Sequence, residues 1–197
     1  MGDMVTWRHG VLLLPLLAAA CGEQAEPAVA THVDDWRDEV IYQVVTDRFD
    51  NGDSQNDSAG GVGTEPSNLA RYQGGDWRGL TRRLDYIQGL GATTVWISPL
   101  VFGQERMGKW DGYHGYWALD FTRHNPHFGE VSDLRELTRQ AHRRGMKVLL
   151  DMVTNHTGQV FFYDLDGDGK ATDKERFPPY HSTGPYTAPL VWLTSRP

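Results

Sequence analysis

Three short apolar segments, separated by two amphipathic ones, most constrain the fold of this chain. The apolar segments lie at 40–45, 92–100 and 146–153 and are rich in β-branched residues. Each is too short for a helix, so each is predicted to form a buried strand. An alternation of strands and helices favours parallel pairing with right-handed crossovers. The chain is therefore predicted to have an α/β fold.

Two helices are predicted between these strands. The first spans about 76–91, where leucine and isoleucine recur at helical spacing, and the second ends at Gly145. Connections from each helix to the next strand are tight, but those that leave the carboxyl ends of the strands are long and polar. That asymmetry is typical of a (β/α)8 barrel, whose site is built from the loops at one face. A doubly wound sheet would share part of it.

Composition and the N-terminus indicate an exported protein. The chain has 197 residues, a net charge of −7 and 39% apolar residues, which suits a globular unit and argues against nucleic acid as a partner. An apolar run at 11–20 follows Arg8 and is too short to span a bilayer, so residues 1–21 are predicted to be a signal peptide. Cys21, the only cysteine, follows this run directly, as at a bacterial lipoprotein processing site.

We therefore expect lipidation of Cys21, a tether at 22–35, and membrane contact only through the lipid anchor. The alternative is ordinary signal cleavage, which would make the protein periplasmic or extracellular. A single cysteine allows no disulfide within the chain, so calcium is the expected stabiliser of an exported protein of this kind.

Four ordered motifs carry a family resemblance. They are "DEVIYQVVTDRFDNGD" at 38–53, "YQGGDWRGL" at 72–80, "YHGYWALDFTRHNPHFG" at 113–129 and "DMVTNH" at 151–156. In this order and spacing they resemble the first half of the alpha-amylase family of glycoside hydrolases, and in detail its cyclodextrin glycosyltransferase and maltogenic amylase branch. The resemblance implies about three strands of a (β/α)8 barrel at 36–157 and the start of an inserted domain B at 158–197. It also implies an α-glucan or maltooligosaccharide substrate.

The same resemblance implies roles for five side chains. Asp151 would organise the site, Asn155 would ligate calcium, and His156 would hydrogen-bond the sugar at the cleavage point. Tyr116 would stack on the sugar beside that bond, and His114 would bind a hydroxyl group. Stacking an aromatic ring on the apolar face of a sugar excludes water while the edge groups make hydrogen bonds. The alternative is an ordinary core aspartate beside a loop histidine.

Two segments are candidate Ca²⁺ sites, because both offer hard oxygen ligands in glycine-containing turns. In the first, the resemblance implies six ligands: Asn51, Asp53, Asn56, Asp57, the Gly74 carbonyl and Asp76. The second owes nothing to the resemblance and fits the twelve-residue EF-hand pattern with Asp164, Asp166, Asp168, Lys170 and Glu175. The alternatives are a solvated turn for the first segment and a plain acidic turn for the second. A true EF-hand sensor would need flanking helices, which the sequence does not support.

The expected catalytic carboxylates are missing from this chain. In the family, the nucleophile Asp, the acid Glu and a third Asp follow later barrel strands, and no segment here resembles those signatures. We therefore expect them beyond Pro197, in a complete enzyme that hydrolyses or transglycosylates α-glucans; this chain alone would be inactive. Three parallel strands cannot close a barrel, so the third should expose apolar residues. The alternative function is a non-catalytic, calcium-stabilised surface lipoprotein that binds glucan or only calcium.

Overall fold

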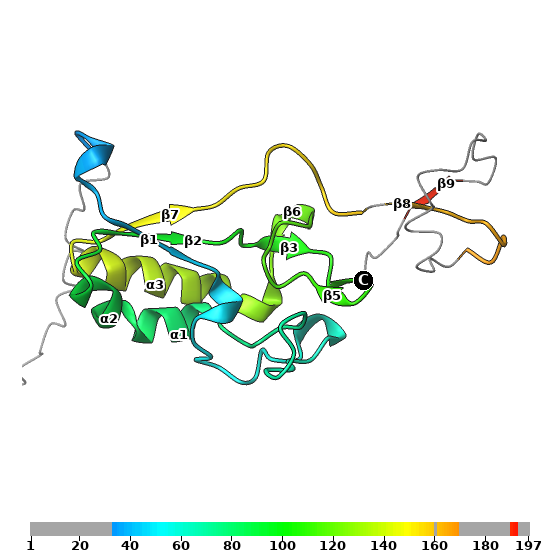
Figure 1. Cartoon of the computed structure of the whole chain (residues 1–197), viewed down its shortest axis with the longest axis horizontal. Helices are drawn as coiled ribbons and strands as arrows, with labels where there is room; N and C mark the ends of the chain where they lie inside the picture. The colour runs from blue at the N-terminus through cyan, green and yellow to red at the C-terminus, as the bar shows by residue number, and fades with distance from the viewer. Residues whose placement is uncertain (1–32, 160, 170–189, 193–197) are drawn as a thin grey trace, which may run out of the picture.

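A computed structural model describes residues 33–159, 161–169 and 190–192 (Figure 1). The predictions for the signal peptide and Cys21, for nearly all of the tether, and for Lys170 and Glu175 lie outside the described residues. Of the predicted domain B at 158–197, only three short pieces are described.

The centre of the fold is a three-stranded parallel sheet. It comprises β1 (Ile41–Val44), β2 (Thr94–Ile97) and β7 (Lys147–Leu150), in the order β1-β2-β7. The helices α1 (Trp77–Arg82), α2 (Leu84–Gly89) and α3 (Val131–Arg143) lie along one face of this sheet (Figure 1). The predicted strand and helix order and the parallel pairing are therefore confirmed.

The first helix differs from the prediction. A single helix over 76–91 was expected, but the chain forms α1 and α2 with a break at Arg83, whose φ of −102° and ψ of 6° lie outside the helical range. The Arg83 amide donates to the Leu80 and Thr81 carbonyls and so ends α1. Apolar spacing continues across the break, which is why the sequence pattern does not reveal it. No helix among the described residues is long and apolar enough to cross a bilayer.

The core lies between the sheet and the helices. Val44, Val95 and Ile97 of the sheet pack against leucine and isoleucine side chains of the helices, including Leu80, Leu84, Ile87 and Leu137. Burial of each such side chain contributes about 1.5–3 kcal/mol to the hydrophobic driving force. This layer holds the carboxyl ends of the three strands side by side.

The opposite face of the sheet is only partly covered by described residues. Ile41 on that face of β1 is 43% exposed, and Leu150 at the end of β7, which pairs with the core residue Ile97, is 54% exposed. The prediction of full burial therefore holds for β2 except Trp96, which is partly exposed, and fails for β1 and β7. The apolar exposure at β7 agrees with the expectation that three strands do not close a barrel.

The connection at 98–132 was predicted to be a loop, and that prediction is wrong. It contains two antiparallel pairs, β3 (Val101–Gly103) with β6 (Ala118–His124) and β4 (Arg106–Met107) with β5 (Trp110–Asp111). β3, β4 and β5 have only two or three residues and give no detectable alternation, and the seven residues of β6, ALDFTRH, do not alternate regularly between apolar and polar side chains, which explains the error. The remaining short elements are η1 (Trp36–Asp38), η2 (Thr46–Arg48), η3 (Ala59–Gly61), η4 (Pro126–Phe128) and the antiparallel pair β8 (Phe161–Tyr163) and β9 (Leu190–Trp192).

Polar contacts fix both ends of the parallel sheet. At the amino ends, Glu39 accepts hydrogen bonds from the Thr93 and Thr94 hydroxyls at 2.6 and 2.8 Å and pairs with Lys147 at 2.5 Å. These contacts, with Lys147 the largest cause, lower the pKa of Glu39 to about 2. At the carboxyl ends, the Thr46 amide donates to the Ser98 hydroxyl at 3.1 Å. The strand ends that carry the candidate site are thereby tied together.

Candidate functional site

Four side chains from two distant segments meet around Tyr116, beyond the carboxyl end of β7. The Tyr116 hydroxyl donates to Asp151 Oδ2 at 2.7 Å, and the Tyr116 amide donates to His114 Nδ1 at 2.9 Å. His156 Nε2 lies 3.0 Å from the Tyr116 carbonyl oxygen. The four side chains predicted to bind sugar thus lie together, and we call His114, Tyr116, Asp151 and His156 the Tyr116 cluster.

Two members of this cluster, Tyr116 and His114, have pKa values shifted toward their neutral forms. The hydrogen bond to Asp151 is the main cause that raises the pKa of Tyr116 to about 12, so the phenol stays neutral. Burial, with a smaller effect from the Arg48 charge, lowers the pKa of His114. Because His114 Nδ1 accepts a hydrogen bond, the neutral ring carries its proton on Nε2, which makes that nitrogen a donor.

The aromatic rings of the cluster are arranged as a platform. The His114 and Tyr116 rings are stacked, with centroids 5.7 Å apart and planes 23° from parallel. Trp117 meets the His114 ring edge-on, with centroids 4.6 Å apart. His156 is exposed beside these rings, and Asn155 is exposed next to it in the loop after β7. The arrangement suits a ligand with an apolar face and hydroxyl edges, while calcium ligation by Asn155 stays a prediction.

Asp47 and Arg48, at the end of β1, were not singled out from the sequence. Asp47 is only 1% exposed and accepts hydrogen bonds from the Gln73 and Gly74 amides, and its burial raises the pKa of its carboxyl group to about 6. The Arg48 guanidinium lies 3.5 Å from the centroid of the Tyr113 ring. The sequence could have indicated both residues, because they come just after the strand predicted at 40–45, where the loops of the site begin.

Asp76 organises the loop that contains the first candidate calcium site. Its Oδ1 accepts from the Gly79 amide at 2.6 Å and caps α1. Its Oδ2 accepts from the Gly52 and Asp53 amides at 3.0 and 2.7 Å. One buried carboxylate therefore joins the start of α1 to the loop.

Two of the other predicted ligands of this loop lie close to Gly74, and Asn51 Nδ2 donates to Asp57 Oδ1 at 2.7 Å. Gly74 has a φ of +89°, and a Cβ atom there would lie 2.5 Å from Asn51 Nδ2 and 2.6 Å from Asp57 Oδ1. Burial raises the pKa of Asp57, and the nearby carboxylates of Asp76 and Asp53 add to the rise. Among the described residues, the buried Asn56 Oδ1 has no hydrogen-bond partner.

These features fit a bound cation. A buried amide oxygen without a donor and a carboxylate close to two others both gain from a positive charge. Asp53 is the weakest member of the ligand set, because its Oδ2 already pairs with Arg78 at 2.6 Å.

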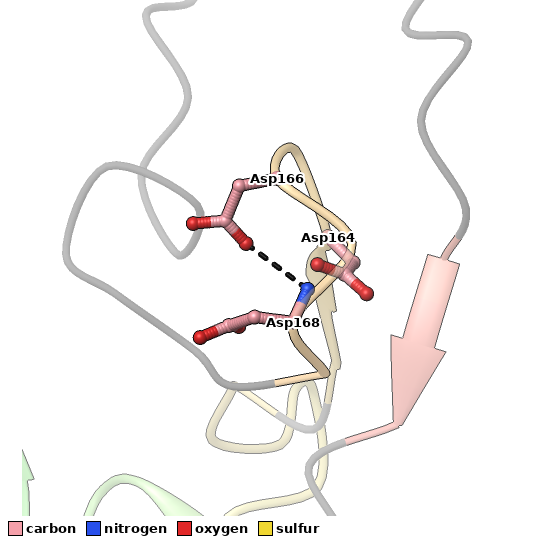
Figure 2. Close-up of side chains that lie close together, drawn as sticks. All are labelled: Asp164, Asp166 and Asp168. Carbon is pink, nitrogen blue, oxygen red and sulfur yellow. Dashed lines mark hydrogen bonds between the residues drawn. The ribbon is translucent and has the colours of Figure 1, made fainter.

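The second candidate calcium loop follows β8 (Figure 2). One carboxylate oxygen from each of Asp164, Asp166 and Asp168 lies within 4.8 Å of the others. Asp164 accepts from the Gly167 and Gly169 amides, and Asp166 accepts from the Asp168 amide at 3.1 Å. These turn contacts alone account for the geometry, so calcium binding here stays a prediction. The element before the loop is a strand rather than a helix, which agrees with the expectation that this is no EF-hand sensor.

Comparison with known proteins identifies the family. The family model of the alpha-amylase catalytic domain matches residues 43–192, more than half of the chain. An alpha-amylase of Streptomyces lividans is 48% identical over 107 residues, which is 52% of this chain and 12% of that protein. The periplasmic alpha-amylase of Escherichia coli is 36% identical over 174 residues, which is 80% of this chain and 25% of that protein.

The solved structure of CldA, a cyclomaltodextrin glucanotransferase, matches with a TM-score of 0.57 and 43% identity, over 62% of this chain and 27% of that one. The chain thus spans little more than a quarter, at most, of the length of these three proteins. Its three parallel strands with helices on one face correspond to part of the (β/α)8 barrel of such enzymes. The chain therefore belongs to the alpha-amylase family of glycoside hydrolases.

Proposed function

We propose that the protein that carries this chain hydrolyses or transglycosylates α-glucans, with the Tyr116 cluster as part of its sugar site. The observation that carries the proposal is the convergence of His114, Tyr116, Asp151 and His156 beyond the carboxyl end of β7. In (β/α)8 enzymes the active site lies at this face of the barrel. Relatives named alpha-amylase and cyclomaltodextrin glucanotransferase support the same substrate class.

In this proposal each member of the cluster binds or orients the sugar. The Tyr116 ring packs against the apolar face of a glucose unit, and its hydrogen bond to Asp151 keeps the ring from turning. His114 Nε2 donates to a sugar hydroxyl group. His156 Nδ1 accepts from another hydroxyl group, because His156 Nε2–H donates to the Tyr116 carbonyl. Such bonds strengthen as the sugar distorts. Retaining glycosidases cleave the bond with two carboxyl groups about 5–5.5 Å apart, which we expect beyond Pro197.

Calcium belongs to the proposal as a structural ion. The 51–76 loop would hold it through Asn51, Asn56, Asp57 and the Gly74 carbonyl, with Asp76 fixing the loop and Asp53 as a weaker ligand. Its charge would offset the repulsion between the clustered carboxylates. Asn155 and the 164–168 loop are further candidate positions.

Export is the last part of the proposal. We expect the signal at 1–21, the tether at 22–35 and a lipid on Cys21 to place the enzyme outside the cytoplasm, and a relative named as periplasmic supports this. Radiolabelled palmitate incorporated by the wild type and not by a Cys21→Ser variant would support the anchor. Equal labelling of both proteins would contradict it.

A turnover assay tests the enzymatic proposal. The protein that carries this chain should release the chromophore from a blocked nitrophenyl maltoheptaoside. Tyr116→Ala and His156→Ala should each lower kcat/KM about 10–100-fold, as expected for loss of a site hydrogen bond or stacking contact worth about 1.5–3 kcal/mol. Tyr86→Ala, at an exposed tyrosine of α2, is the matched control and should leave kcat/KM unchanged.

The same assay separates the alternative function. A non-catalytic glucan-binding lipoprotein would bind maltoheptaose without turning it over. Equal kcat/KM in wild type, Tyr116→Ala and His156→Ala would refute the assigned sugar site even if turnover occurs.

A further inference from the structure

We infer that the Asp47–Arg48 pair in η2 positions both candidate sites and couples calcium binding to sugar binding. Asp47 contacts the calcium loop, and Arg48 contacts the loop of the Tyr116 cluster. Both are positioning residues, and neither is assigned a contact with the sugar or the ion. The inference rests on the proposed function and adds a regulatory link between its two ligands.

Asp47 fixes the peptide that offers a calcium ligand. Both its carboxylate oxygens lie 3.0 Å from the Gln73 amide nitrogen, and Oδ1 accepts from the Gly74 amide at 3.1 Å. Its own carbonyl accepts from the Gly75 amide at 2.8 Å. Three consecutive amides of the calcium loop are thus held by one residue of η2. The Gly74 carbonyl, a proposed ligand, cannot shift without disturbing Asp47.

Arg48 holds the start of the aromatic loop. Its guanidinium lies over the Tyr113 ring at 3.5 Å, a geometry typical of a cation–π contact. Tyr113 precedes His114, and their rings meet edge-on with centroids 5.2 Å apart. The position of the Arg48 guanidinium therefore affects, through Tyr113, the ring of His114, which is predicted to bind the sugar.

The contacts of Arg48 indicate positioning rather than simple stabilisation. Arg48 Nη2 donates to the Leu69 carbonyl at 2.9 Å, and Nε lies 3.2 Å from Asp47 Oδ2. Among the described residues, its buried Nη1 has no hydrogen-bond partner. A buried donor without an acceptor lowers the stability of the fold. Stabilisation alone therefore does not explain where the Arg48 guanidinium lies. The guanidinium joins Leu69 of the calcium loop, Asp47 of η2 and Tyr113 of the aromatic loop.

This connection predicts linkage between the two ligands. Calcium orders the 51–76 loop, which fixes Asp47 and Leu69 and hence Arg48 against Tyr113. Sugar that binds the ordered platform then loses less conformational entropy, so its affinity rises. Linkage is reciprocal, and a coupling of this kind is typically fivefold or more.

Calorimetric titration of maltoheptaose into the protein that carries this chain tests the inference. The measured quantity is the ratio of the sugar Kd in excess chelator to the Kd in saturating calcium. We expect a ratio of about five or more in the wild type and close to one in Arg48→Met and Arg48→Lys. Lysine keeps the charge beside Asp47 but cannot stack on Tyr113 and reach Leu69 together. It therefore provides the test if the methionine variant does not fold.

Arg123→Lys is the matched control, because Arg123 of β6 makes the same kind of contact, over the Phe102 ring of β3 at 4.4 Å, and neither residue is assigned to a candidate site; it should keep the wild-type ratio. A wild-type ratio of one, or Arg48 variants that keep the full wild-type ratio, would overturn the coupling. The second outcome would instead place any linkage at another ion, such as one on Asn155. Failure of the wild type to bind maltoheptaose in calcium would refute the proposed function itself.

Discussion

Asp76 offers the sharpest test of how the calcium loop is built. This carboxylate is 1% exposed and serves two elements at once, since it caps α1 and holds the Gly52 and Asp53 amides. Asp76→Ala removes the two oxygen atoms that accept these three hydrogen bonds. We therefore expect a large loss of folding stability even when no calcium is present.

The size of the loss follows from these contacts. Loss of an N-cap costs about 1 kcal/mol. Each of the two part-buried backbone amides, those of Gly52 and Asp53, costs about 1.5 kcal/mol when it loses its charged acceptor. The expected decrease in the free energy of unfolding is therefore about 4 kcal/mol. Asp76→Asn should lose about half as much, because one carbonyl oxygen can serve either α1 or the loop but not both.

Urea unfolding in excess chelator, followed by tryptophan fluorescence, measures these differences. Asp85→Ala is the matched control, because Asp85 is an exposed aspartate of α2 that pairs with Arg144, and it should leave the midpoint unchanged. A decrease below about 1 kcal/mol for Asp76→Ala would refute the assigned role of Asp76.

Three further predictions concern titration and calcium. The pKa of Tyr116 is about 12 against an ordinary 10, so the contribution of this group to stability is present below pH 10 and is lost as the pH rises toward 12. Asp151→Asn should move the pKa of Tyr116, measured by NMR, back toward 10. An unchanged pKa would contradict the hydrogen bond between Tyr116 and Asp151. The pKa of Glu39, about 2 against an ordinary 4.5, means that its contribution is present above pH 4.5 and is lost as the pH falls toward 2. Glu39→Gln should therefore lower the urea midpoint at neutral pH but not near pH 2, and a constant difference across this range would argue against the Lys147 pairing. Asn56→Ala should weaken calcium binding about tenfold in a competition assay with a chelating dye, and unaltered affinity would exclude Asn56 as a ligand. Stability in chelator should change little, because among the described residues Asn56 Oδ1 has no donor to lose and Nδ2 makes only a long contact, 3.4 Å, with Asp76 Oδ2.

The apolar pattern predicts the parallel sheet, and the family resemblance predicts which residues form the Tyr116 cluster; the parallel sheet explains why they meet. Carboxyl ends of parallel strands lie at one edge, so polar residues that follow β2 and β7 are brought near each other. Apolar spacing could not show the break at Arg83, because Leu80, Leu84 and Ile87 keep helical spacing across it.

Other features depend on tertiary contacts that no local pattern encodes. The Arg48–Tyr113 contact joins residues in different loops, and its geometry depends on how both loops pack. The short pairs β3–β6 and β4–β5 likewise form because their partners are held nearby, not because of their own propensity.

Maltoheptaose binding tests the central claim most directly. Calorimetric titration in saturating calcium should show saturable binding to the protein that carries this chain, and Tyr116→Ala should weaken it about tenfold or more while Tyr86→Ala leaves it unchanged. Binding of equal strength in wild type and Tyr116→Ala, or no binding by the folded wild type, would contradict a sugar site built around Tyr116.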